Sequence, residues 1–160
     1  MSLFYPDVML ENIYEIDSEK LKKNGIKAVV FDIDNTLAYN AEPSPSEKAI
    51  TFLNNLKKDG FYVIVASNNT EERVKKFCQN LDSLYVHKAN KPLGRKIRAL
   101  LKEIDVDKKE AAIVGDQIFT DILCGKMMNM FAILVKPFDT NENKFIKFKR
   151  KVENLFIKWD

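Results

Sequence analysis

One stretch of this chain, residues 27–37, constrains the fold more than any other. It opens with an unbroken apolar run from Ala28 to Phe31, and two carboxylates one residue apart, Asp32 and Asp34, follow at once. A run without polar alternation is what a strand buried on both faces requires, so these residues predict a central strand of a parallel sheet. In open parallel sheets, ligands bind beyond the carboxyl ends of the strands, and we expect the two acids in that crevice.

Four further apolar segments predict the rest of the sheet. They span residues 61–66, 84–87, 111–114 and 131–135, and segments with helical periodicity or helix caps separate them. Strands that alternate with helices indicate an α/β fold, here a doubly wound, Rossmann-like parallel sheet of about five strands with helices on both faces. On the N-terminal side of the central strand, residues 5–23 are predicted to form short helical pieces, with a helix cap at Asp17 and Ser18.

Length and composition favour a single globular domain over residues 1–160. The chain has 160 residues, 46% of them hydrophobic and 31% charged, and its net charge of +3 is too small to indicate a nucleic-acid partner. Within it we expect a core over residues 27–136, an N-terminal extension over 1–26 and a C-terminal amphipathic helix over about 142–158.

The sequence shows no signal for insertion into a membrane or for secretion, and this favours a cytoplasmic location. The sequence contains no 18-residue apolar run, which argues against a transmembrane helix, and its first residues do not resemble a secretory signal. The two cysteines, Cys78 and Cys124, lie far apart in unrelated contexts and are predicted to be reduced rather than bridged or metal-bound.

Polar side chains follow four of the predicted strands at their carboxyl ends. They are Asp32 and Asp34, Ser67, Lys91 and Asp116. Clustered carboxylates raise one another's pKa unless a cation neutralises them, and Mg²⁺ with oxygen ligands is suited to that role. A lysine and a serine hydroxyl add a point charge and a donor for phosphate oxygens. The set therefore describes a phosphoryl-transfer site in which an aspartate can attack phosphorus.

The motifs that carry these residues resemble the four motifs of the haloacid dehalogenase (HAD) superfamily of phosphatases. They are Val30–Leu37, Ser67, Lys91-Pro92, and Gly115-Asp116-Gln117 through Asp121. The resemblance covers residues 27–136 with the right order and spacing. It implies the order 5-4-1-2-3 for the five predicted strands, which would put Asp116 on the strand beside Asp32.

The resemblance also implies roles for the residues of the first motif. Asp32 would be the nucleophile and a metal ligand. Asp34 would protonate the leaving group and later activate the hydrolytic water, while its backbone carbonyl binds Mg²⁺. Thr36 would support this loop at the substrate-binding site.

The later motifs would hold the phosphoryl group and complete the metal site. Ser67 and Lys91 would bind the transferring phosphoryl group, and Asn68 is a further candidate for substrate binding. Asp116 would be the metal acid of the fourth motif. Because Gln117 stands where many members have a second acid, Asp121 is expected to supply it in a supporting role.

No cap domain is expected. Only the loop over residues 39–46 follows the first motif, and residues 68–90 separate Ser67 from Lys91. An open cleft suits a phosphate carried on a large or membrane-bound substrate. The N-terminal segment and the first and fourth motifs further resemble the bacterial YqeG branch, which is related to the mitochondrial phosphatidylglycerophosphate phosphatases.

We therefore expect a Mg²⁺-dependent phosphatase that hydrolyses a phosphomonoester through an aspartyl-phosphate. A phospholipid head group, such as that of phosphatidylglycerophosphate, is the first substrate hypothesis. One alternative is a phosphatase of small metabolites, nucleotides or phosphoproteins. Another is a switch or binding module that is phosphorylated on Asp32 without turnover. Asp34 argues against the switch, because a dedicated acid/base two residues after the nucleophile promotes turnover.

The C-terminal segment has two interpretations. Aromatic and aliphatic residues recur at helical spacing, and basic residues, among them Lys147, Lys149, Arg150 and Lys151, lie between them. The segment fits a last helix that packs on the sheet. It also fits an amphipathic helix that lies on an anionic bilayer, which would put the protein at the inner membrane surface. The two can coexist.

Overall fold

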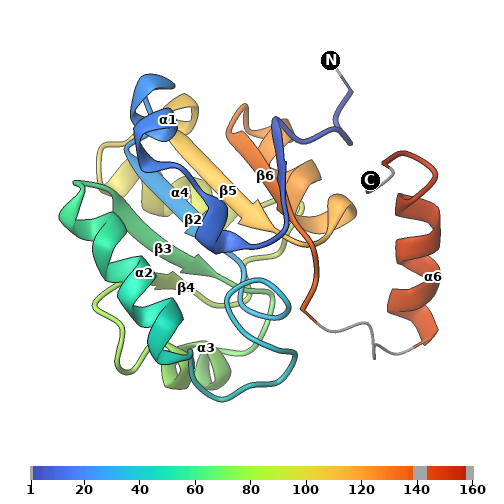
Figure 1. The fold of residues 1–160 in the computed structure, drawn as a ribbon, viewed down its shortest axis with the longest axis horizontal. Coiled ribbons are helices and arrows are strands. Elements are labelled where there is room, and N and C mark those ends of the chain that lie inside the picture. Colours follow the sequence, from blue (N-terminus) through green and yellow to red (C-terminus); the bar gives the residue numbers. More distant parts are fainter. Residues whose placement is uncertain (1, 139–143, 158–160) are drawn as a thin grey trace.

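The computed structural model describes residues 2–138 and 144–157, and a parallel sheet forms its centre (Figure 1). Among these residues the sheet has six strands in the order β1-β6-β5-β2-β3-β4. The strands are β1 Val8–Leu10, β2 Ala28–Phe31, β3 Tyr62–Ala66, β4 Leu84–Val86, β5 Ala111–Gly115 and β6 Phe131–Val135. The predicted α/β class and the relative order of the five predicted strands are confirmed.

The strand β1 corrects the expectation for the N-terminal segment. Residues Val8–Leu10 were predicted to lie in short helical pieces, but they pair in parallel with β6, Val8 opposite Ile133 and Leu10 opposite Val135. A half-buried run of three residues is too short for a period to identify it, and its backbone bonds come from a strand far along the chain. The predicted helix cap is confirmed, because the Asp17 side chain accepts from two amides of α1, Ser18–Lys23.

Helices cover both faces of the sheet (Figure 1). Besides α1 and the C-terminal helix, the chain forms α2 Glu47–Lys58, α3 Glu71–Phe77, α4 Arg95–Glu103 and α5 Leu123–Met127. Single-turn segments accompany them, 3₁₀ turns at Ile13–Glu15 and Lys108–Glu110 and a π-helical turn at Ile118–Ile122. Ser46 and Thr70 cap α2 and α3, because their side chains accept from the amides of Ala49 and Arg73.

The two faces of β2 explain its unbroken apolar run. Val29 and Phe31 belong to one hydrophobic cluster, with side chains of α2 and α3. Ala28 and Val30 belong to the other, with side chains of α4 and α5. Every residue of β2 therefore lies in a core. Both cysteines, Cys78 and Cys124, are buried and free.

The last described helix, α6, spans Lys144–Glu153. Residues 142, 143 and 158 of the predicted helix lie outside the described part of the chain. Figure 1 shows α6 at one margin of the molecule, set apart from the helices that cover the sheet. None of the helices described here is both long and apolar enough to cross a bilayer.

Candidate active site

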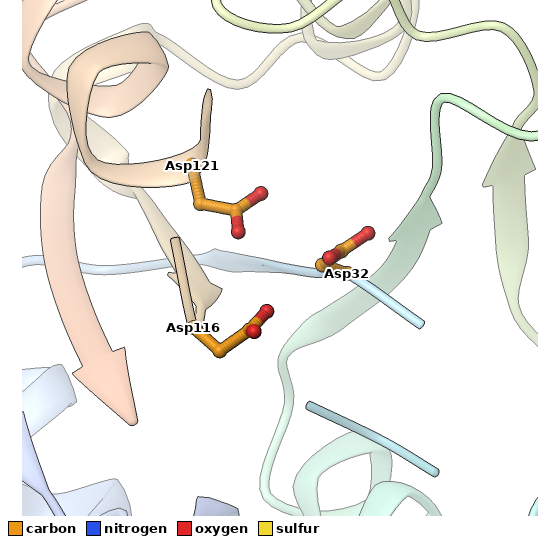
Figure 2. A group of neighbouring side chains, drawn as sticks. All are labelled: Asp32, Asp116 and Asp121. Carbon is orange, nitrogen blue, oxygen red and sulfur yellow. The ribbon is translucent and has the colours of Figure 1, made fainter. Parts of the chain in front are cut away.

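The carboxyl ends of β2 and β5 bring three aspartates together (Figure 2). Asp32 follows β2, Asp116 follows β5, and Asp121 lies in the π-helical turn just beyond. One carboxylate oxygen from each residue lies within 4.8 Å of the other two. The pairing of β2 with β5, in which Phe31 lies opposite Val114, places Asp32 and Asp116 side by side.

Gly115 makes the room that Asp121 occupies. A Cβ atom at this position would lie 2.2 Å from Cγ of Asp121, so a side chain would displace the carboxylate. The amide of Gln117 donates to Oδ2 of Asp121 at 3.3 Å and helps to hold it. Asp121 was predicted only as a supporting residue, yet its fully buried carboxylate lies within the cluster.

Lys91 supplies a positive charge to this cluster. Its Nζ lies 3.0 Å from Oδ1 of Asp32 and 2.7 Å from Oδ1 of Asp121, and only 3% of its side chain is exposed. Asn68 holds the backbone at this point, because its Oδ1 accepts from the Lys91 amide at 2.9 Å. The expected contact of Asn68 with substrate stays a prediction.

Burial of these charges changes their pKa values. Removal from water raises the pKa of Asp32 to about 8; Lys91 opposes this shift, and Asp121 and Asp116 add to it. Burial, helped by Asp121, raises the pKa of Asp116 to about 6. Burial alone would lower the pKa of Lys91, but the carboxylates of Asp121 and Asp32 outweigh it and raise that pKa. The ammonium group therefore stays charged, while Asp32 and Asp116 need a further cation to ionise fully at neutral pH.

The cluster has the donor set of a hard divalent cation. Carboxylate oxygens from Asp32, Asp116 and Asp121 converge, and Mg²⁺ and related ions prefer such oxygen ligands. A cation among them would offset both the burial and the mutual repulsion that raise the pKa of Asp32 and that of Asp116. The residues present therefore fit a divalent metal.

The carboxylate of Asp34 lies outside the three-aspartate cluster and is held by three donors. Its Oδ1 accepts from the amide of Ala41 at 3.0 Å and from Nη2 of Arg73 at 3.2 Å. Its Oδ2 accepts from Nδ2 of Asn69 at 2.8 Å. The predicted contact of Asp34 with metal runs through its backbone carbonyl and stays a prediction.

Asn69 and Arg73 were not predicted from the sequence as site residues. A signal existed, because α3 begins directly after the polar residues that end β3, and its first turn must therefore lie near the crevice. Nothing in the sequence says that an arginine in this turn reaches back to an acid on another strand.

Thr36 and Ser67 hold hydroxyl groups at the site. The buried Thr36 donates from Oγ1 to Oδ1 of Asp116 at 3.2 Å and so orients that acid. Oγ of Ser67 accepts from the backbone amide of Asn69 at 3.1 Å and from its side-chain amide at 3.0 Å. In these two contacts the serine is the acceptor, which leaves its proton to donate to a ligand oxygen.

The helix α6 also reaches the site, which the sequence analysis did not predict. Arg150 forms an ion pair with Oδ2 of Asp116 through Nη2, and its Nη1 donates to the Asp116 carbonyl oxygen at 3.0 Å. Lys149 donates to Oε1 of Gln117 at 3.0 Å, and Glu153 accepts from the amide of Phe119 at 3.1 Å. In the structure α6 therefore packs on the rest of the molecule, which is one of the two interpretations given for the C-terminal segment.

The fold and this site define a phosphatase of the HAD superfamily. Among solved structures, the chain is similar to the cobalt-bound form of the deoxy-D-mannose-octulosonate 8-phosphate phosphatase YrbI from Haemophilus influenzae. The TM-score is 0.56 at 16% sequence identity, and the match covers 84% of this chain and 88% of that one. The predicted superfamily and the predicted class of enzyme, a hydrolase of phosphoric monoesters, are confirmed.

Within this superfamily, the chain belongs to the family described as mitochondrial PGP phosphatase, whose sequence model matches residues 1–137. It is 34% identical over 154 residues to the probable phosphatase YqeG of Bacillus subtilis (strain 168). That match covers 96% of this chain and 90% of YqeG. It is 28% identical over 171 residues to the chloroplastic/mitochondrial phosphatidylglycerophosphate phosphatase 1 of Arabidopsis thaliana. That match covers 96% of this chain but 47% of the plant protein, so the chain spans about half of it.

Proposed function

We propose that this phosphatase depends on Mg²⁺ and hydrolyses the terminal phosphomonoester of phosphatidylglycerophosphate through an aspartyl-phosphate. The observation that carries the proposal is the position of Asp32, which lies within reach of two further carboxylates and of the Lys91 ammonium group. A nucleophilic carboxylate, oxygen ligands for a cation and a lysine are the groups that phosphoryl transfer requires.

Asp32 would act as the nucleophile. One of its carboxylate oxygens attacks phosphorus, and the bond from phosphorus to the leaving oxygen breaks with its electron pair on that oxygen. Lys91, hydrogen-bonded to Asp32, and the Ser67 hydroxyl would donate to the phosphoryl oxygens. A Mg²⁺ ion held by Asp32, Asp116 and Asp121 would neutralise the negative charge of the nucleophile and the phosphate, with the Asp34 carbonyl as a further ligand.

Asp34 would complete the turnover as acid and then base. It gives a proton to the leaving oxygen, then takes one from the water that attacks the phosphorus of the aspartyl-phosphate. Inorganic phosphate leaves and Asp32 is regenerated. Arg73 and Asn69 would hold the Asp34 carboxylate ready for this exchange. This role distinguishes a turnover enzyme from a phosphoaspartate switch.

Two observations support a lipid substrate. The family and the plant relative carry the name of phosphatidylglycerophosphate phosphatases. The loop after Asp34 also borders a cavity of about 460 Å³ with an apolar and aromatic part, formed by Leu37, Ala38, Tyr39 and Phe138. This cavity could receive the leaving group of a lipid. The protein would then work from the cytoplasm at the surface of the inner membrane.

The test is phosphate release from a panel of phosphomonoesters with Mg²⁺, including phosphatidylglycerophosphate in mixed micelles and a sugar phosphate, a nucleotide and a phosphopeptide. The control is Asp32→Asn, which keeps the shape of the side chain but removes the nucleophile. Strong hydrolysis of the lipid by the wild type alone is expected. Activity confined to small esters or phosphopeptides would overturn the lipid substrate. Formation of a stable phosphoprotein on Asp32 with no phosphate release would favour the switch.

The role of Asp34 has its own test. Asp34→Asn should lose turnover by about 10²-fold or more, because general acid–base catalysis contributes about 10²–10⁴-fold. Circular dichroism checks that the fold is kept. A folded Asp34→Asn enzyme that works at the full rate would contradict the mechanism.

A further inference from the structure

The helix α6 presents a guanidinium group to the carboxylate that would bind the metal. We propose that Arg150 is an internal counter-ion of Asp116, which competes with the divalent cation for this carboxylate and so couples metal loading to the docking of α6. Arg150 is thus a positioning residue of the metal site. The inference rests on the metal-binding part of the proposed function.

The contacts of Asp116 show why a cation must compete. Its side chain is fully buried, and both oxygens already accept, Oδ1 from the Thr36 hydroxyl and Oδ2 from Nη2 of Arg150. Thr36 is itself fully buried in the loop after β2, so it cannot withdraw without disturbing that loop. Arg150 belongs to a separate helix and its side chain is 17% exposed. It is therefore the donor that a cation would replace.

The charges at the site favour this exchange. Within the described residues, two side-chain cations contact the three-aspartate cluster, Lys91 on Asp32 and Asp121, and Arg150 on Asp116. Three ionised carboxylates with both cations carry a net charge of −1, against −2 once Arg150 withdraws, so the cluster attracts a metal ion less strongly while the guanidinium is in place. A divalent ion and a guanidinium on the same buried carboxylate repel each other strongly, because the surroundings screen them poorly. Metal binding is therefore favoured by withdrawal of Arg150.

The other contacts of α6 keep the helix attached when Arg150 withdraws from Oδ2 of Asp116, so that the helix can loosen without leaving the molecule. Glu153, at the end of α6, accepts from the Phe119 amide, and Ile157, just after the helix, is buried in a core cluster. Lys147 and Lys151 of α6 are exposed, and so is Leu155 in the turn that follows. The contacts of α6 thus converge on the segment after β5 that carries Asp116. Loss of the Arg150 contact should loosen the helix without removing its apolar anchor.

The family comparison does not supply this role. The family model matches residues 1–137, and α6 begins at Lys144. The coupling must also be reciprocal, because two binding events that share one carboxylate affect each other's free energy equally. Metal should weaken the docking of α6, and loss of the Arg150 contact should strengthen metal binding by the same factor.

Metal titration tests the inference without any substrate. Isothermal calorimetry with Mg²⁺ or Mn²⁺ should compare the wild type with Arg150→Gln and Arg150→Lys. The matched control is Lys151→Gln, which removes the same charge from an exposed position of the same helix. We expect Arg150→Gln to bind the metal about 10-fold more tightly, a typical coupling between two sites, and Arg150→Lys to lie between it and the wild type. The control should stay within about 2-fold of the wild type, as expected for a screened surface charge.

The opposite results would overturn the inference. Unchanged or weaker metal binding by a folded Arg150→Gln variant would mean that Arg150 does not compete with the cation. An equal gain in Lys151→Gln would reduce the effect to overall charge. Circular dichroism of each variant confirms that the fold is kept.

Hydrogen exchange gives a second readout. The amides of α6 in the wild type should exchange faster with Mg²⁺ than without it, and Asp116→Asn should remove this difference. Slower or unchanged exchange in the wild type would contradict the coupling.

Failure of the proposed function can be distinguished from failure of this inference. If Arg150→Gln binds metal more tightly but the wild type hydrolyses no ester, only the proposed phosphatase function is contradicted. If the wild type hydrolyses an ester but Arg150→Gln leaves metal affinity unchanged, only the coupling of Arg150 to the metal is contradicted.

Discussion

Lys91 and Arg150 both neutralise carboxylates of the same cluster, but the chain holds them in different ways. Lys91 is 3% exposed, bridges Asp32 and Asp121, and stands on a loop whose backbone Asn68 holds. Arg150 is 17% exposed, contacts Asp116, and comes from a C-terminal helix outside the residues that match the family model. The difference predicts that Lys91 is a permanent cation of the three-aspartate cluster and that Arg150 is an exchangeable one.

The largest effect is expected from removal of Lys91, the permanent cation. Lys91→Met should lose about 3–5 kcal/mol of unfolding free energy, because it leaves buried carboxylates without their partner. Urea denaturation without metal measures the loss. Arg150→Gln is the matched comparison and should lose clearly less, since its partner Asp116 keeps the Thr36 hydroxyl. Equal losses for the two variants would erase the distinction between the cations.

The second test moves the carboxylate that Lys91 holds. Gly115→Ala would place a Cβ atom 2.2 Å from Cγ of Asp121 and should cost about 2–3 kcal/mol by overpacking. Gly125→Ala is a matched control, because its Cβ would lie 2.4 Å from Cγ2 of Ile113, in the core. Both variants should be destabilised in denaturation, but metal affinity should fall only for Gly115→Ala. An equal fall in both would show that the space at Gly115 has no special role in the site.

The third test is pH. Burial raises the pKa of Asp32 to about 8 and that of Asp116 to about 6, whereas unfolded aspartates titrate near about 4. Between these values the folded protein binds more protons than the unfolded chain, so its stability without metal should fall as pH rises from about 4 to about 8. We expect a loss of several kcal/mol, with about 7 kcal/mol as the upper bound that these two pKa values allow; denaturant titrations at several pH values measure it, and saturating Mg²⁺ should remove it. A metal-free protein that gains stability over this range would contradict the assigned burial of charge.

The smallest test concerns the second donor to Asp116. Thr36→Val keeps the shape but removes the hydroxyl that donates to Oδ1, and should cost about 1 kcal/mol, a typical value for one hydrogen bond. Thr36→Ser restores the donor and is the control. In the metal titration, Thr36→Val should change affinity less than Arg150→Gln, because it removes no competing charge. A larger effect of Thr36→Val would make Thr36, and not Arg150, the main control of Asp116.

The sequence predicted the parts of the site that depend on local patterns. The apolar run of β2 and the polar residues after β2, β3 and β5 identified Asp32, Ser67 and Asp116, because strand ends in a parallel sheet meet at one edge. The strand β1 was missed, since three half-buried residues carry no reliable period. Asp121 was expected only in a supporting place, because the space left by Gly115 becomes visible only when the chain is folded.

By itself, the sequence determined the α/β class, the central strand and the acids at its end, because hydrophobic periodicity and the alternation of strands with helices show over short stretches of chain. The strand-end pattern also placed Lys91 at this edge, but only the tertiary structure decided which arginines meet these acids. The ion pairs of Asp34 with Arg73 and of Asp116 with Arg150 join residues 39 and 34 positions apart. Such pairs form when packing brings two elements together, and no local pattern of charge specifies that meeting.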